Sequence, residues 1–108
     1  MIDEQEFQLR ADEALQNLYK ALGKAGDEHD FEADFGGALT VEFEDPPAKF
    51  VVSPNSPVRQ IWVSAHSRSF KLDWDQARGE FVLPETGQSL KALIQDAISK
   101  QLGEPVQL

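Results

Sequence analysis

Apolar side chains recur at helical spacing near both ends of the chain. The first stripe consists of Phe7, Ala11, Leu15, Leu18 and Leu22. Residues three or four positions apart share one face of a helix, so the stripe predicts an amphipathic helix over residues 4–22, which Gly23 and Gly26 end. A second helix is predicted after Ser89, a favourable N-cap residue, and its apolar stripe runs to Leu102.

Between the two helices the apolar spacing changes to two, which is typical of strands. Strands are predicted at residues 31–35, 39–44, 49–53, 59–65, 69–73 and 80–83, with turns at Pro46-Pro47, 54–57 and 78–79. Phe35 and Leu39 share the buried face only if an odd number of residues, here 36–38, forms the first loop. This register places Asp34 opposite Thr40, Glu32 opposite Glu42, and Asp30 opposite Glu44.

The order of helix, strands and helix predicts a single α+β domain. We expect a two-layer α/β sandwich, with the N-terminal and C-terminal helices packed on one face of an antiparallel meander sheet. The other face of the sheet then meets water or a partner.

Charge is distributed unevenly along the 108 residues, whose net charge is -9. Residues 1–45 hold 13 acidic and three basic residues, a net charge of -10. The remaining 63 residues hold six acidic and seven basic residues, a net charge of +1. This argues against nucleic acid as a partner and favours cations or basic protein surfaces, although an acidic face kept for solubility gives the same pattern.

Cysteine is absent, which excludes disulfides, thiolate metal sites and thiol catalysis. The first residues resemble neither a secretory signal nor a transit peptide, and no apolar run approaches the roughly 20 residues that span a bilayer. The sequence therefore predicts a cytoplasmic protein.

Acidic side chains on the first two predicted strands oppose one another. Like charges in opposed positions destabilise a sheet by about 0.2 to 1 kcal/mol per pair, and a bound hard cation would relieve the repulsion of Glu32 and Glu42. Alternatively, the long glutamate side chains splay apart in water. The preceding loop adds the potential ligands Asp27, Glu28, His29 and Asp30, although their spacing matches no calcium-binding loop.

Trp62 is predicted to lie outside the core. In the fourth strand, Ile61 and Val63 suit the buried face, which turns Gln60 and Trp62 onto the helix-free face. Tryptophan is enriched in binding hot spots, so Trp62 is a candidate docking anchor, with Arg59 and Lys71 as basic neighbours. The alternative is a bulge that returns Trp62 to the core. Trp74, in phase with Phe70 and Leu72, is predicted to be core.

The segment Pro57-Val58-Arg59-Gln60-Ile61-Trp62-Val63-Ser64 resembles the signature strand of the frataxin family. Similarity extends to Leu39-Thr40-Val41-Glu42-Phe43, to Leu72-Asp73-Trp74 and to Gly87-Gln88-Ser89-Leu90, in the family's order and spacing. Essentially the whole chain is covered. The chain departs from the family's pattern at Ser53-Pro54-Asn55, before the signature. It also departs late in the first helix, which is often acidic in the family and here carries Tyr19, Lys20, Gly23 and Lys24.

The resemblance implies weak binding of ferrous or ferric iron on an acidic ridge and docking on a cysteine desulfurase and its iron-sulfur scaffold protein. The candidate iron ligands are Asp12, Glu13, Asp27, Glu28, His29, Asp30, Glu32, Asp34, Glu42 and Glu44. The candidate partner contacts are Arg59, Gln60, Trp62 and Lys71. The resemblance to frataxins also implies that the protein regulates cluster assembly and is not an enzyme. It implies a monomer that is able to form iron-dependent oligomers. The alternatives are a ferroxidase that stores iron and an acidic protein-binding module without a metal.

Overall fold

The computed structural model describes residues 2–44 and 47–108. Its elements, in chain order, are α1 (Glu4–Gly26), β1 (Glu32–Gly36), β2 (Ala38–Glu44), β3 (Pro47–Asn55), the 3-10 helix η1 (Ser56–Val58), β4 (Gln60–Ala65), β5 (Arg68–Asp75), β6 (Glu80–Val82) and α2 (Leu90–Leu102). No helix within these residues is long and apolar enough to cross a membrane.

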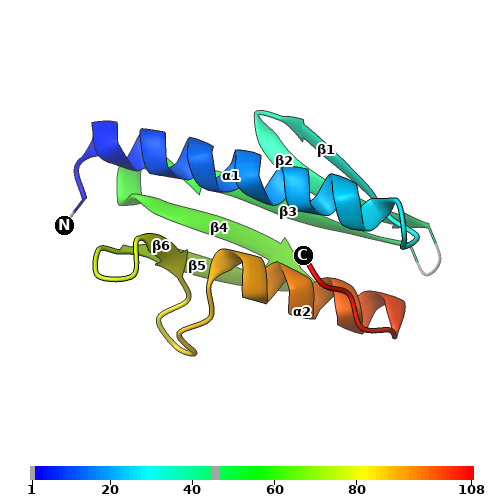
Figure 1. Cartoon of the computed structure of the whole chain (residues 1–108). Coiled ribbons are helices and arrows are strands. Elements are labelled where there is room, and N and C mark those ends of the chain that lie inside the picture. Colours follow the sequence, from blue (N-terminus) through cyan, green and yellow to red (C-terminus); the bar gives the residue numbers. More distant parts are fainter. Residues whose placement is uncertain (1, 45–46) are drawn as a thin grey trace.

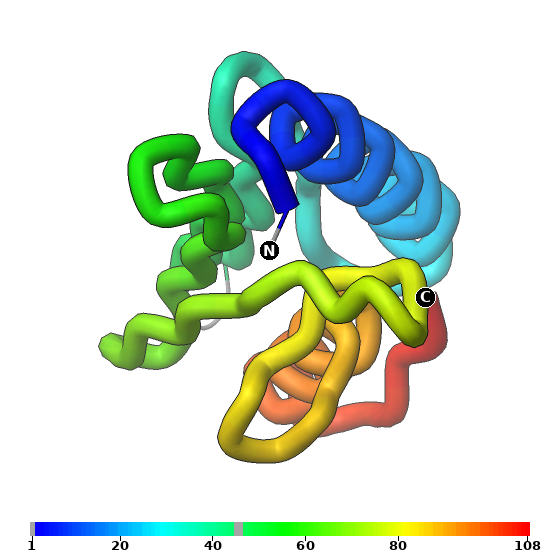
Figure 2. Tube along the Cα trace, turned by 90° about the vertical axis from the view of Figure 1, so that its left-hand side faces the viewer, coloured from blue at the N-terminus to red at the C-terminus, as the bar shows by residue number. Residues whose placement is uncertain are grey.

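The six strands form one antiparallel sheet in the order β1-β2-β3-β4-β5-β6. Both helices lie side by side against the same face of this sheet (Figure 1). The view along the helices shows the sheet curving past them (Figure 2). The predicted α+β sandwich with a meander sheet is therefore confirmed.

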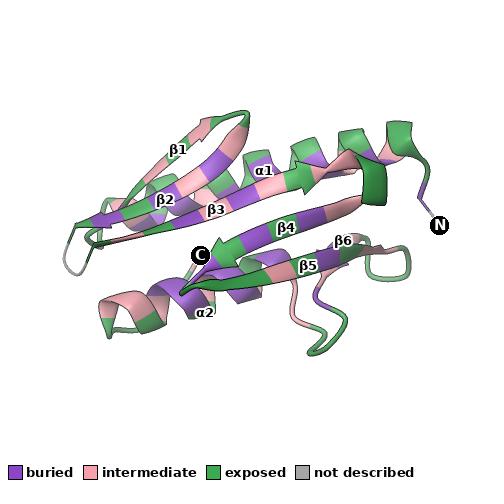
Figure 3. Cartoon of the chain, turned by 180° about the vertical axis from the view of Figure 1, so that it is seen from behind, coloured by how far each residue is buried: buried purple, intermediate pink, exposed green. Residues whose placement is uncertain are grey.

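Aromatic and aliphatic side chains fill the space between the sheet and the helices. Phe7, Phe50 and Phe81 are among the largest fully buried side chains, and the rings of Phe7 and Phe81 meet edge-on at 5.8 Å. Buried and exposed residues alternate along β4, which is visible from the helix-free side (Figure 3). Ile61 and Val63 are buried and Trp62 is exposed, as the parity of this strand predicts.

The first helix is longer than predicted, because α1 continues through Gly23 and ends at Gly26. Ala25 extends the buried stripe by a further turn beyond Leu22, and its burial keeps the helix intact past a glycine. Gly26 itself fits closely, since a Cβ at this position would lie 3.2 Å from the carbonyl oxygen of Phe31.

Trp74 is only half-buried, so its assignment to the core is wrong in part. Its ring packs against Phe81 at 5.1 Å, while its indole Nε1 donates a 2.9 Å hydrogen bond to Oε1 of Gln76 at the surface. Tryptophan commonly lies at the edge of a core in this way, with its ring packed against apolar side chains and its N–H group at the solvent-exposed surface.

The register of β1 against β2 agrees with the parity argument. Phe35 pairs with Leu39, Asp34 with Thr40 and Glu32 with Glu42. The predicted pairing of Asp30 with Glu44 is wrong, because the ladder begins at Glu32 and the chain bends at Asp30.

Strand ends differ from the prediction by a few residues. The fourth strand begins one residue later than predicted, because Arg59 adopts a left-handed conformation with φ 52° after η1. Of the predicted turn at Pro46-Pro47, Pro47 belongs to β3 and Pro46 lies outside the described residues.

Candidate functional site

The cross-strand pair Glu32 and Glu42 lies exposed on β1 and β2. Glu42 has a second neighbour, because Lys49 of β3 stands opposite it and its Nζ lies 3.8 Å from Oε1 of Glu42. This exposed ion pair offsets part of the repulsion between the two glutamates. The strain that favoured a bound cation is therefore smaller than the sequence alone suggested.

A hollow of about 750 Å³ lies where α1 ends and β1, β2 and β3 meet. Its charged and polar lining consists of His29, Asp30, Glu32, Glu42, Glu44 and Lys49. Within residues 2–44 and 47–108, no group of three acidic or histidine side chains converges closely enough to hold a metal ion. The carboxylates that line this hollow therefore do not form a closed coordination cage.

Asp12 and Glu13 lie on opposite flanks of α1. Glu13 forms a 3.2 Å ion pair with Arg10 and lines the groove between the helices. Asp12 accepts a 2.9 Å hydrogen bond from Gln16 and shares its flank with Tyr19, seven residues later, which contacts Phe35 of β1. Of these two predicted ligands, Asp12 is therefore the one on the β1 side of the helix, with the other acidic residues.

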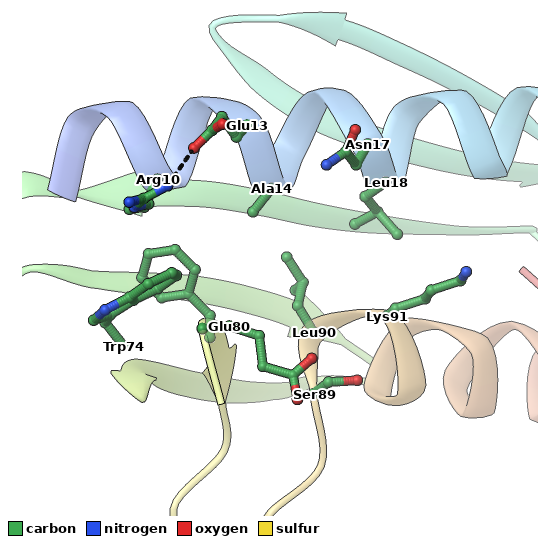
Figure 4. Close-up of a pocket in the computed structure, with 12 residues that line it drawn as sticks. Arg10, Glu13, Ala14, Asn17, Leu18, Trp74, Glu80, Ser89, Leu90 and Lys91 are labelled. Carbon is green, nitrogen blue, oxygen red and sulfur yellow. Dashed lines mark hydrogen bonds and ion pairs between the residues drawn. The ribbon is translucent and has the colours of Figure 1, made fainter. Parts of the chain in front are cut away.

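The groove between α1 and α2 is a second feature that the sequence did not reveal. It has a volume of about 380 Å³, and Figure 4 shows Arg10 and Ala14 of α1 on one side of it and Trp74 and Leu90 on the other. The guanidinium of Arg10 lies 5.6 Å from the centre of the Trp74 ring. Arg10 thereby joins the first helix to the fifth strand.

His29 is held by a residue far away in the sequence. Its Nδ1 lies 2.6 Å from Oε2 of Glu104, which follows α2. The neighbours Asp27, Glu28 and Asp30 are exposed, whereas the His29 side chain is only 16% exposed. His29 therefore has a structural partner, which competes with any ligand role.

Trp62 is fixed on the helix-free face of the sheet. Its indole Nε1 donates a 3.0 Å hydrogen bond to Oε1 of Gln60, whose Nε2 donates a 3.0 Å hydrogen bond to Oδ1 of Asp73. The Nζ of Lys71, directly opposite on β5, lies 4.9 Å from the centre of the indole ring. Trp62 stays 38% exposed although Gln60 and Lys71 contact it and Asp73 holds Gln60.

Of the three other predicted partner contacts, Gln60 and Lys71 thus touch Trp62 directly. Asp73 was missed, although its place two strand positions after Lys71, on the same face, was a usable signal. Arg59 precedes β4 and takes no part in the contacts that join Trp62 to Gln60, Lys71 and Asp73.

Residues 1–104 match the family model of the frataxin-like domain. The chain belongs to the frataxin family. Frataxin relatives include the protein named iron-sulfur cluster assembly protein CyaY from Pseudomonas aeruginosa, which is 34% identical over 101 residues, 91% of this chain and 93% of the relative. The protein of the same name from Azotobacter vinelandii is 29% identical over 101 residues, 91% of each chain.

The fold of this frataxin also matches a solved structure. The frataxin from Psychromonas ingrahamii superimposes with a TM-score of 0.84 at 24% sequence identity, covering 98% of this chain and 97% of that one. At this identity the match establishes the arrangement of helices and strands. It leaves the roles of individual side chains to the residues themselves.

Proposed function

We propose that this frataxin is an iron-binding regulator of iron-sulfur cluster assembly that docks on a cysteine desulfurase and its scaffold protein. Relatives that cover nearly the whole chain are named iron-sulfur cluster assembly proteins. The observation that carries the docking assignment is the exposed Trp62, held by Gln60 and Lys71 on the helix-free face.

The held position of Trp62 favours docking energetically. An anchor that is already oriented in the free protein loses little side-chain freedom on binding, so more of its burial becomes affinity. A shallow hollow of about 190 Å³ next to Trp62, lined by Val51, Ser53 and Ser69 among others, provides a mixed apolar and small polar surround. This surface suits a partner that inserts an apolar side chain beside the indole.

The acidic surface supplies the second part of the proposal. Asp12 of α1, the loop residues 27–30, and Glu32, Asp34, Glu42 and Glu44 of the first two strands place exposed carboxylates at one side of the fold. Carboxylate oxygens are hard ligands that bind iron. A concentration of negative charge also attracts a basic protein surface. Iron is the cargo of this surface, held by few protein ligands and water.

The docking assignment is tested by measuring binding to a purified bacterial cysteine desulfurase and to its scaffold protein by calorimetry. Trp62→Ala is expected to weaken binding to at least one of them about tenfold or more, the effect of losing a hot-spot residue. Leu9→Ala is the matched control, since Leu9 is an exposed apolar residue on α1, 57% exposed. Unchanged binding by Trp62→Ala, with both variants folded by circular dichroism, contradicts the assignment.

The metal assignment is tested by titrating Fe(II) or Fe(III) into the labelled protein and following backbone amide NMR signals. Changes are expected to be confined to residues 3–34 and 42–44 and to weaken in the double variant Glu32→Gln/Glu42→Gln. Glu85→Gln, which removes an exposed carboxylate from a distant loop, is the control. Spectra that iron leaves unchanged contradict a metal role, and oxygen consumption on Fe(II) addition would instead favour a ferroxidase.

A further inference from the structure

A separate hollow of about 360 Å³ lies between the tip of the β4–β5 hairpin and α2. Its apolar lining comes from both layers and consists of Val63, Ala65, Phe70, Leu93 and Ala97. Figure 3 shows this hairpin tip beside α2. The volume falls in the range of roughly 300 to 1,000 Å³ that is usual for small-molecule sites.

The rim of this hollow is cationic in a protein whose net charge is -9. Arg68 and Lys100 line it from opposite layers, and Asp96 forms a 3.2 Å ion pair with Lys100. The guanidinium of Arg68 lies 5.1 Å from the centre of the Phe70 ring, and no carboxylate in the described part of the chain pairs with it. One positive charge is therefore left beside an apolar floor.

The hairpin tip is itself held against α2. His66 and Ser67 both have left-handed backbones, with φ 52° and 61°, at positions where Asn-Gly is the favoured sequence. The side chain of His66 crosses to α2, where its Nε2 lies 3.1 Å from the carbonyl oxygen of Ala97. A histidine in this strained turn thus closes one end of the hollow and fixes the distance between Arg68 and the helix.

We propose that this hollow binds a small amphipathic monoanion, an aromatic or branched aliphatic carboxylate. The carboxylate would accept a bidentate pair of hydrogen bonds from Arg68, and the apolar body would rest on Phe70 and Leu93. A neutral ligand would leave the unpaired guanidinium unused, and a cation would be repelled by it. The site is distinct from the acidic surface and from the face that carries Trp62.

The probe is 2-naphthoate, with 2-naphthamide as its neutral isostere, titrated into the labelled full chain and followed by amide NMR. Saturable shifts are expected in residues 63–70 and 93–100 for the naphthoate, with binding of the amide about tenfold weaker, the usual effect of losing one charge-assisted hydrogen bond. Arg68→Gln is expected to weaken naphthoate binding by the same factor. Ala97→Leu, which fills the hollow, is expected to abolish it.

Lys91→Gln is the matched control, since it removes one positive charge from the same helix but lines the groove between the helices. It is expected to change naphthoate affinity less than twofold. Equal affinity for acid and amide, equal effects of Arg68→Gln and Lys91→Gln, or shifts centred outside the two segments would each overturn the proposal. If Ala97→Leu does not fold, the comparison of acid with amide and Arg68→Gln with Lys91→Gln still decides it.

Discussion

Nδ1 of His29 lies 2.6 Å from Oε2 of Glu104, although 75 residues separate them. The contact joins the loop between α1 and β1 to the segment that follows α2, where Val106 is buried. Hydrogen bonds that join segments distant in sequence close large loops of chain, and they are broken in the unfolded state. The pair therefore ties the acidic loop to the end of the second helix.

We expect either His29→Ala or Glu104→Ala to lower the free energy of unfolding by about 0.5 to 1.5 kcal/mol, the net value of a typical hydrogen bond. The double variant should cost less than the sum of the single variants, since both remove the same contact. Urea denaturation of the four proteins measures this coupling. Strictly additive effects would show that the contact contributes nothing to stability.

The cross-strand pair Glu32 and Glu42 gives a second stability prediction. Glu32→Gln should raise the free energy of unfolding by about 0.2 to 1 kcal/mol, because it removes one of two opposed like charges. Glu42→Gln should raise it less, since it also removes the attraction to Lys49. Thermal melts at low and high salt measure both effects, which screening should reduce. A larger gain from Glu42→Gln than from Glu32→Gln would contradict this account.

The periodicity of apolar residues predicts most of the fold. The helical stripe beginning at Phe7 and the two-residue alternation around Phe35 and Leu39 settled the element types and the β1–β2 register. The end of α1 was mispredicted because glycine propensity is a local signal, whereas the burial of Ala25 depends on the sheet that the helix covers. Tertiary packing overrode propensity at that point.

The candidate site was predictable where it depends on strand parity and not where it depends on distant contacts. The outward position of Trp62 follows from its neighbours in β4. The contact between His29 and Glu104 has no sequence signal, because nothing local relates residues on different elements. Helix geometry alone places Asp12 and Glu13 on different flanks of α1. Only the structure shows that the flank of Asp12 faces β1 and that of Glu13 faces the groove toward α2.

The start of α2 offers a third test of stability. The hydroxyl of Ser89 accepts a 3.2 Å hydrogen bond from the backbone nitrogen of Ala92. Ser89→Ala should cost about 1 kcal/mol, whereas Ser89→Asp should retain the cap, because aspartate is an equally good N-cap residue. In a domain of this size, 1 kcal/mol corresponds to a fall of roughly 4 °C or more in Tm. Equal melting temperatures for the two variants would contradict the capping role.

Gln60 tests whether orientation of Trp62, and not only its presence, supports docking. The side chain of Gln60 bridges the indole and Asp73 through two 3.0 Å hydrogen bonds. Gln60→Ala removes this bridge but leaves Lys71 over the ring, so the indole N–H should become more mobile in heteronuclear NOE measurements. Stability should change by no more than about 1 kcal/mol, because the lost bonds are exposed.

If docking uses the oriented indole, Gln60→Ala should weaken binding to the partner that Trp62→Ala affects, by a smaller factor of about 3 to 10, the usual cost of ordering a free side chain on binding. Gln8→Ala is the matched control, since it removes an exposed glutamine side chain from α1, outside the sheet face that carries Trp62. Binding that is unchanged while the indole becomes mobile would mean that the partner reorients Trp62 itself. In that case the hydrogen bonds from Gln60 to Trp62 and Asp73 order the sheet surface of the free protein but do not contribute to docking.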